Sequence, residues 1–345
     1  MTENLKLDIA NQDRYSRQVL FAPIGAAGQK RIRTAKVAVV GCGAIGAASS
    51  SLLARAGVGT LQIIDRDYVE ASNLQRQVLF DEEDARQSLP KAEAAARHLS
   101  SINSEVHVDA VVKDLTPANI DLLTNAHLIL DCTDNFETRY LLNDFAVNSR
   151  LPWIYAGAVA SQAVTMSVVP EDTACLACIF PEPPRGNQMT CDTAGILNST
   201  ANLVACIQVT EALKLIIGAR DQVRRTLLSL DLWTNQRSEV STAAPRSDCR
   251  CCRGRVFDHL DGKLRPQVTM CGRNSVQIHE RERPIDFSEM NSRLAPHGQV
   301  RHNEMVLKFW RDAYEMTLFR DGRAIIKGTT DPAVARSLYA RFVGS

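Results

Sequence analysis

The sequence lacks an excess of charge of either sign, a membrane-spanning apolar run and a signal peptide. Its 40 Lys and Arg residues balance 39 Asp and Glu residues for a net charge of +1, so charge favours neither nucleic acid nor an anionic membrane as the main partner. No uninterrupted apolar run approaches the roughly 20 residues that a membrane span needs. Met1–Asp13 is polar and acidic, without the apolar core of a signal peptide. We therefore expect a soluble cytoplasmic protein.

The length and the cysteine content narrow the class of protein further. The 345 residues suffice for one large α/β domain with a smaller appended domain. The chain contains 10 cysteines. In a cytosolic protein, cysteines more often serve as metal ligands, catalytic thiols or small buried residues than as disulfides.

The first third of the chain has the pattern of a Rossmann unit. Lys36–Val40 is a β-branched run typical of a buried parallel strand. The glycine-rich loop Gly41–Gly46 follows, then the helical segment Ala44–Ala56, and then a second strand, Thr60–Ile64, which ends at Asp65. This order predicts nucleotide binding.

Within this unit, Gly41, Gly43, Ala44 and Gly46 are predicted to bring backbone N–H groups close to phosphate. Asp65 is predicted to accept hydrogen bonds from ribose hydroxyls. The alternative is that the glycine-rich turn only packs a helix onto a strand.

Cationic and amide side chains follow the second strand. Asn73, Gln75, Arg76 and Gln77 lie in one short segment, and Lys91 begins the predicted helix Lys91–Ile102. Cations here suit the concentrated charge of a triphosphate better than NAD. The alternative is a solvated loop followed by a helix with an exposed lysine.

A second acidic segment follows the predicted strands Val106–Val111 and Leu128–Leu130. Ligands of open parallel sheets bind at the carboxyl ends of the strands, where Asp134 is placed to hold magnesium against phosphates. Asp131 is expected to end the strand and cap backbone. Asp134 could instead be the N-cap of the helix Phe136–Ser149.

Two Cys-x-x-Cys pairs lie downstream. Cys175 with Cys178, and Cys249 with Cys252, have the spacing of four thiolate ligands of a closed structural zinc site. A redox pair and unrelated buried thiols are the alternatives, and Cys251 could replace a neighbour as ligand.

Cys191 differs from these cysteines. It follows the proline-rich loop Pro181–Thr190 and precedes a helical stretch from about Ile196 to Ile217. A thiol near a helix N-terminus can have a lowered pKa, so Cys191 is a candidate nucleophile; the alternative is an incidental loop thiol. Three further cysteines, Cys42, Cys132 and Cys206, have apolar neighbours in the sequence and are predicted to be buried spacers.

The C-terminal segment, residues 268–345, has the pattern of a small α+β domain with a hairpin turn at Asp321-Gly322. It contains no recognisable set of catalytic residues. We expect domains at 1–255 and 268–345. Expected strands are Ser275–Ile278, Met305–Lys308, Tyr314–Phe319 and Arg323–Lys327, and expected helices are Phe287–Leu294 and Pro332–Phe342. The fold class is α/β: a Rossmann-like, mostly parallel sheet with a zinc-bound lobe, plus this C-terminal domain.

Taken together, several segments resemble the ThiF/MoeB/HesA family of bacterial relatives of ubiquitin-activating enzymes. The resemblance covers roughly Asp13 to Arg255. It rests on Arg14-Tyr15-Ser16-Arg17-Gln18, the Gly41–Gly46 loop, Asp65-Arg66-Asp67, Ser72-Asn73-Leu74-Gln75-Arg76-Gln77, Leu89-Pro90-Lys91 and Cys132-Thr133-Asp134-Asn135.

The resemblance implies ATP-dependent adenylation of the C-terminal glycine of a ubiquitin-like sulfur carrier that ends in Gly-Gly. It implies a homodimer in which Arg17 reaches the partner's ATP. It also implies that Asp67 and Asn135 belong to the nucleotide site. A sulfur donor, such as a cysteine desulfurase, is implied as a second partner. Cys191-Asp192-Thr193-Ala194-Gly195 and Cys271-Gly272-Arg273-Asn274 are similar to the ThiF branch. In that branch the carrier is ThiS and the sulfur goes to the thiamin thiazole.

We therefore expect an adenylyltransferase in which Arg17, Arg76, Lys91 and Asp134-bound magnesium neutralise charge, with possible sulfur transfer through Cys191. One alternative is a MoeB-type enzyme for a molybdopterin-synthase or other carrier. Alternatives of another class are an NAD-linked oxidoreductase with a zinc lobe and a non-catalytic scaffold.

Overall fold

The computed structural model describes residues 14–182, 194–262, 268–270, 275–278 and 284–344. Cys191 and the Cys271–Asn274 segment lie outside the described residues. The chain forms two compact units, Met1–Lys263 and Leu264–Ser345, and each is treated by itself.

The larger unit is built on an eight-stranded sheet with the order β3-β2-β1-β4-β5-β6-β7-β8. Neighbouring strands from β3 to β5 are parallel, and those from β5 to β8 are antiparallel. This confirms the expected mostly parallel α/β fold. The strands are β1 (Lys36–Val40), β2 (Thr60–Ile64), β3 (His107–Val111), β4 (Leu128–Asp131), β5 (Trp153–Val159), β6 (Gln162–Val168), β7 (Thr226–Asp231) and β8 (Gln236–Ser241).

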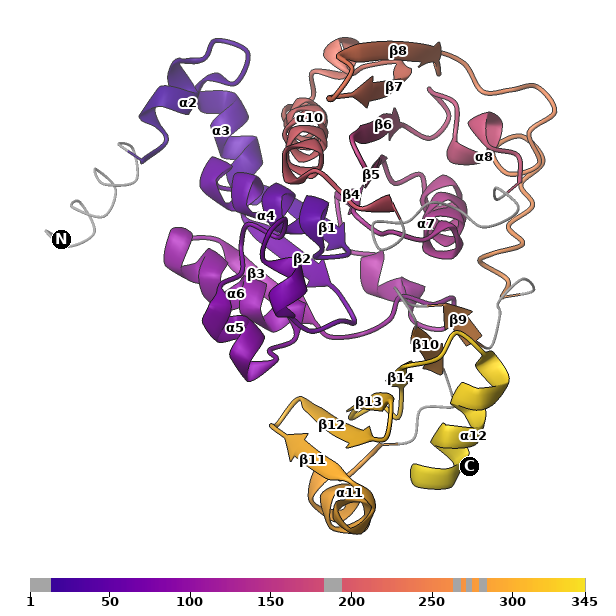
Figure 1. Cartoon of the computed structure of the whole chain (residues 1–345). Coiled ribbons are helices and arrows are strands. Elements are labelled where there is room, and N and C mark those ends of the chain that lie inside the picture. The colour runs from indigo at the N-terminus through magenta and orange to yellow at the C-terminus, as the bar shows by residue number, and fades with distance from the viewer. Residues whose placement is uncertain (1–13, 183–193, 263–267, 271–274, 279–283, 345) are drawn as a thin grey trace, which may run out of the picture. The chain divides into compact units, whose positions relative to one another are not determined.

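Helices cover both faces of this sheet (Figure 1). One face packs against α3 (Gly25–Thr34), α4 (Ala44–Ala56), α6 (Lys91–Ile102) and α10 (Asn198–Ile217). The other face packs against α7 (Phe136–Ser149). Because β1 lies between the two layers, Val37 and Val39 face one core while Ala38 and Val40 face the other. This explains why the strand is apolar at successive positions.

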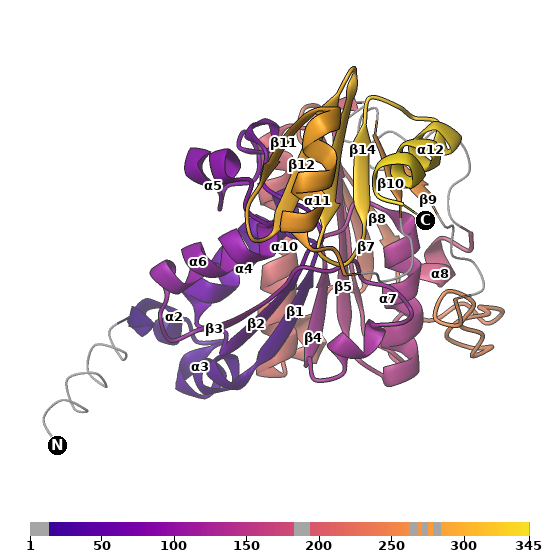
Figure 2. The ribbon, with the colours of Figure 1, turned by 90° about the horizontal axis from the view of Figure 1, so that it is seen from below.

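The strand register brings the predicted site segments together. Val40, the last residue of β1, pairs with Ile64 on one side and with Asp131 on the other. Since these strands are parallel, the glycine loop, Asp65 and the segment after Asp131 leave the same edge of the sheet. Figure 2 shows β3, β2, β1, β4 and β5 side by side in this order.

Among the described helices, only α10 has the length and apolar composition that could cross a membrane. Half of its apolar window is buried inside the protein, where α10 packs against α4 and β5. These contacts are those of a core helix. The short elements of this unit are α2 (Ser16–Leu20), η1 (Ala71–Asn73), α5 (Glu82–Gln87), η2 (Ile120–Leu123), α8 (Leu176–Ile179) and η3 (Arg220–Gln222).

The smaller unit contains a six-stranded antiparallel sheet with the order β11-β12-β13-β14-β10-β9. Apolar residues from one sheet face and from both helices form a separate core, as expected for an α+β domain. Its elements are β9 (Val268–Met270), β10 (Ser275–Ile278), α11 (Phe287–Leu294), η4 (Ala295–His297), β11 (Gln299–His302), β12 (Val306–Arg311), β13 (Tyr314–Phe319), β14 (Ala324–Lys327) and α12 (Pro332–Phe342).

Candidate functional site

The three glycines of the loop Gly41–Gly46 differ in how much space surrounds them. Gly41 has a φ of +88°, and a Cβ there would lie 2.7 Å from the Cys132 carbonyl oxygen. A Cβ at Gly46 would lie 2.0 Å from the Gly41 carbonyl oxygen. Gly43 is different: it is the N-cap of α4, and nothing lies within 4 Å of a Cβ built on it. The first-turn amides of α4 have no side-chain cap, so an anion can approach them there.

Asp65 holds this loop in place. Its carboxylate accepts hydrogen bonds from the backbone N–H of Cys42 and, at 2.7 Å, from that of Asp67. Burial raises the pKa of Asp65, and the nearby Lys91 ammonium partly offsets that effect. A local structural role therefore accompanies the predicted contact with ribose, and the second lone pair on each oxygen can still accept.

Lys91 is buried rather than exposed, with 7 % of its surface accessible. Its Nζ lies 3.3 Å from Asp67 Oδ2, and its backbone N–H donates to the Asp67 carbonyl at 2.8 Å. Burial alone would lower the pKa of Lys91, but Asp67, Asp65 and Asp134 outweigh it and raise the pKa above its usual value. The solvated-lysine alternative is therefore wrong.

Asp131, Asp134 and Asn135, at and after the end of β4, have three different environments. Asp131 is fully buried and accepts hydrogen bonds from Thr133 N at 2.9 Å and Thr133 Oγ1 at 2.7 Å, as expected of a strand-ending cap. Asn135, not Asp134, is the N-cap of α7 and accepts from Thr138 N at 2.8 Å. Asp134 is exposed. Its carboxylate is among the negative charges that raise the pKa of Lys91.

Hydrogen bonds to nearby residues of the chain hold Asn73 and Arg76 in place. Asn73 accepts a hydrogen bond from Glu70 N at 3.2 Å and forms a reciprocal cap with Glu70 around η1. Arg76 donates to the Ser72 carbonyl at 2.8 Å, and Gln75 is exposed. Gln77 is buried, and its Oε1 has no hydrogen-bond partner in the described structure.

The helix α2 is fixed to the C-terminal end of α4. Tyr15 is buried, and its hydroxyl accepts from Asn103 Nδ2 at 2.8 Å, while Gln18 Nε2 donates to the Ala56 carbonyl at 2.9 Å. Arg17 is exposed on the same helix. Because α4 has 13 residues, its two ends are about 20 Å apart. The helix that carries Arg17 is therefore attached at the end of α4 opposite the glycine loop.

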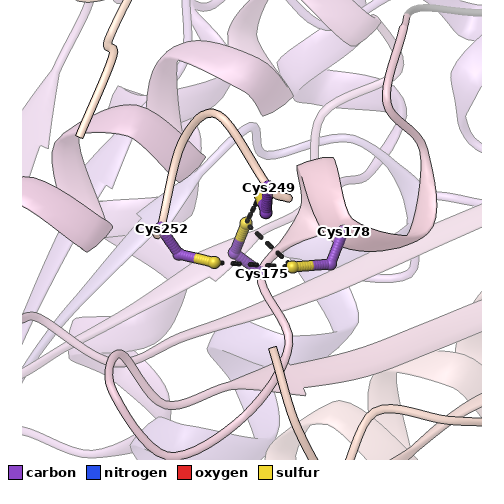
Figure 3. A group of neighbouring side chains, drawn as sticks. All are labelled: Cys175, Cys178, Cys249 and Cys252. Carbon is purple, nitrogen blue, oxygen red and sulfur yellow. Dashed lines mark hydrogen bonds between the residues drawn. The ribbon is translucent and has the colours of Figure 1, made fainter. Parts of the chain in front are cut away.

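Four cysteine sulfur atoms converge as the spacing predicts. Those of Cys175, Cys178, Cys249 and Cys252 all lie within 4.8 Å of one another, and the side chains of the two pairs point toward one another (Figure 3). Three of the sulfur–sulfur distances are 3.8, 3.7 and 3.5 Å. Tetrahedral zinc with Zn–S bonds of about 2.3 Å separates its sulfurs by about 3.8 Å, so these thiolates fit zinc.

Cys251 is outside this cluster. Its sulfur accepts from Asn143 Nδ2 at 3.2 Å and lies 3.4 Å from Asp144 Oδ1. Asn143 also accepts a hydrogen bond from Leu176 N at 2.8 Å. One α7 side chain therefore ties the two cysteine loops together, an interaction that the cysteine spacing did not predict.

The other cysteines were predicted as buried spacers. Cys42 and Cys132 are buried, which confirms the prediction for those two. The prediction is wrong for Cys206, which is exposed. The reason is that composition does not distinguish the two faces of α10: its outward stripe includes Leu203 and Cys206, whereas the polar residues Gln208 and Glu211 are buried.

The comparisons with known proteins agree with this arrangement. The model of the ThiF family matches residues 15–251. The chain is 45% identical over 336 residues to "Sulfur carrier protein ThiS adenylyltransferase" of Bacillus subtilis, covering 96% of this chain and 99% of that protein. It is 36% identical over 250 residues to "SAMP-activating enzyme E1" of Haloferax volcanii, covering 72% of this chain and 91% of that protein.

A solved structure shares the fold. The crystal structure of E. coli MccB with ATP has a TM-score of 0.60 and 25% identity, covering 69% of this chain and 74% of that chain. The family match and the identity to the bacterial relative lead to one conclusion: this chain belongs to the ThiF family.

Proposed function

We propose that the protein is an adenylyltransferase that activates the C-terminal carboxylate of a ubiquitin-like sulfur carrier. The observation that carries the proposal is the meeting of the open helix N-terminus at Gly43, buried Lys91 and exposed Asp134 at one edge of the sheet. A relative aligned over nearly its whole length is named for adenylation of ThiS. We therefore propose a ThiS-like carrier ending in Gly-Gly and a role in making the thiamin thiazole.

The chemistry needs charge control rather than a base. The carrier's carboxylate is already ionised at neutral pH; it attacks the α-phosphorus of ATP, and pyrophosphate leaves. The α4 amides after Gly43, Lys91 and Arg76 are proposed to bind the phosphates, and Asp65, Asp67, Asn73, Gln75 and Asn135 to orient the nucleotide. Magnesium held by Asp134 would supply charge neutralisation for the departing pyrophosphate.

We propose a homodimer in which Arg17 acts on the partner's ATP. The position of α2 supports this, because α2 is attached to the C-terminal end of α4, and the glycine loop lies at the other end of that helix, about 20 Å away along its axis. Exposed apolar side chains also favour a partner surface: Leu20 is 73% and Phe21 is 60% exposed beside Arg17. The outward stripe of α10, with Leu203 and Cys206, is the same kind of surface.

We propose that Cys175, Cys178, Cys249 and Cys252 hold a structural zinc ion. All four ligand positions would be filled by thiolates, so the ion would stabilise the fold and have no open position for a reactant. A thiolate site also suits a reducing compartment, and we place the protein in the cytoplasm.

We further propose that Cys191 transfers sulfur. Its thiolate would attack the acyl-adenylate to form a thioester, with AMP as the leaving group. Alternatively, a persulfide made on Cys191 by a sulfur donor such as a cysteine desulfurase would attack through its outer sulfur, giving an acyl disulfide and AMP.

The test of the proposed function is ATP–pyrophosphate exchange. Exchange should require a Gly-Gly carrier and should disappear when the carrier lacks its final glycine, and ATP with magnesium should raise the melting temperature while NAD does not. A ThiS-like carrier and a molybdopterin-synthase carrier assayed side by side separate the proposed branch from the MoeB-type alternative. Stabilisation by NAD alone, or no exchange with any such carrier, would contradict adenylation.

A further inference from the structure

The backbone that presents Asp134 is held on both sides of Thr133. Asp131 Oδ1 accepts from the Thr133 N–H at 2.9 Å and from its hydroxyl at 2.7 Å. The Thr133 carbonyl accepts from Arg139 Nη2 at 2.6 Å. Thr133, the residue before Asp134, therefore has both its backbone N–H and its backbone carbonyl fixed by buried side chains.

Arg139 is itself closely confined. It is 7 % exposed, and its Nε lies 3.4 Å from Asp131 Oδ2. The guanidinium carbon lies 5.0 Å from the centre of the Phe136 ring and 5.1 Å from that of Tyr155, within range of cation–π attraction. These contacts orient the guanidinium so that Nη2 reaches the Thr133 carbonyl.

Fold stability alone is a poor explanation for this pair. A buried ion pair is often no more stabilising than packed apolar residues of the same volume. The pair is also not fully hydrogen-bonded, because Arg139 Nε and Asp131 Oδ2 have no hydrogen-bond partner in the described structure. The well-made contacts are those to Thr133, which indicates that the pair shapes this turn.

We propose that Arg139 is a positioning residue for the adenylation site. By holding the Thr133 carbonyl, it fixes the direction in which the exposed Asp134 carboxylate meets the cation that accompanies ATP. This inference rests on the proposed function, since it assigns Arg139 to the magnesium-dependent part of the same site.

The test compares two arginines that each bond a backbone carbonyl at opposite ends of α7. Arg139 serves Thr133 at the N-terminal end, while Arg255 donates to the Val147 carbonyl at 3.1 Å near the C-terminal end and stacks on Phe257. Arg139→Lys keeps a cation for Asp131 but loses the planar fork. Arg255→Lys, at an exposed arginine, controls for the loss of an arginine–carbonyl bond on α7.

Calorimetric titration with ATP, in magnesium and in EDTA, gives the readout. We expect Arg139→Lys to weaken ATP binding in magnesium roughly tenfold or more, the size of a lost charge-assisted hydrogen bond, and by less than about twofold in EDTA. The half-saturating magnesium concentration for exchange should rise in parallel. Arg255→Lys should bind ATP like the wild type in both buffers.

Thr133→Val provides a milder second variant in case Arg139→Lys does not fold. It removes the hydroxyl bond to Asp131 and keeps the shape, so a rise of about threefold in half-saturating magnesium is expected. If a folded variant lost affinity equally in magnesium and EDTA, or lost none, the positioning role would be wrong. A wild-type protein without carrier-dependent exchange would instead contradict the proposed function.

Discussion

The ring of Tyr15 occupies the space that a side chain at Gly57 would need. A Cβ at Gly57 would lie 2.5 Å from Tyr15 Cζ, and the residue has a φ of +83° at the C-terminal end of α4. Gly57 therefore ends α4 in the left-handed conformation and also leaves room for the Tyr15 ring to pack against it. The exposed Arg17 lies on α2, the helix that this contact holds in place.

Gly57→Ala should destabilise the protein by about 1–3 kcal/mol, from backbone strain together with the clash. Gly25→Ala is the matched control, because Gly25 has a φ of +56° with nothing within 4 Å of its Cβ position. Denaturant unfolding should show a larger loss for Gly57→Ala. Equal losses would mean that the Tyr15 contact contributes nothing.

Arg17 and Asp134 should complement each other between subunits. Arg17→Ala and Asp134→Ala homodimers should each lack carrier-dependent exchange. After unfolding and refolding of an equal mixture, one site per heterodimer would combine an intact Asp134 with the partner's intact Arg17. About a quarter of the wild-type exchange should return, because half of the dimers are mixed and half of their sites are complete. No recovery in verified heterodimers would place Arg17 at its own subunit's site.

Asp134→Ala should abolish exchange while leaving the melting temperature nearly unchanged, because Asp134 is exposed and Asn135 caps α7. Asp121→Ala, at another exposed acid, is the control for loss of surface charge. Exchange rates at saturating ATP and carrier provide the measurement. Activity within about tenfold of the wild type would leave only about 1.4 kcal/mol for the carboxylate, too little for a metal ligand.

The cysteine cluster should hold about one zinc ion per subunit. Elemental analysis after gel filtration measures the content. Cys175→Ser should lose zinc and solubility before it loses any single catalytic step, because structural zinc binding is linked to folding. Cys206→Ser, at an exposed cysteine outside the cluster, should retain both. A metal-free wild type of undiminished stability would exclude a structural ion.

Cys191→Ser should separate adenylation from sulfur transfer. Adenylation uses no thiol, so carrier-dependent exchange should continue. The covalent, reductant-sensitive adduct between enzyme and carrier should be absent from non-reducing gels and from intact mass spectra, whereas Cys206→Ser should still form it. If the Cys191→Ser protein makes the same adduct, another cysteine is the acceptor.

Elements with a strong local pattern were predictable from the sequence. β1, β2 and α4 were predicted with their observed bounds, because buried β-branched runs and a glycine at the end of a helix are local signals. The antiparallel strands of the larger unit, β6, β7 and β8, were not predicted. β8 is exposed along its whole length and is mostly polar, so no alternation of apolar and polar residues identifies it.

For the site, residue types were predictable but their internal partners were not. That Asn135 rather than its neighbour caps α7 is decided by backbone geometry at one residue. That Asp65 binds the Cys42 amide depends on how two strands lie side by side. Arg139 gave no signal at all, since an arginine in a helix is usually solvated and only the tertiary fold buries this one.

The position of α10 in the chain has a consequence for folding during synthesis. This helix packs on α4 and β5, so the ribosome must translate through Ile217 before the first strands can close their core. Until then, the face of α4 that packs on α10 stays uncovered, and a nascent chain in this state exposes apolar surface that chaperones bind. A nonsense mutation upstream of Asn198 would therefore release a fragment with an incomplete core rather than an autonomous nucleotide-binding domain.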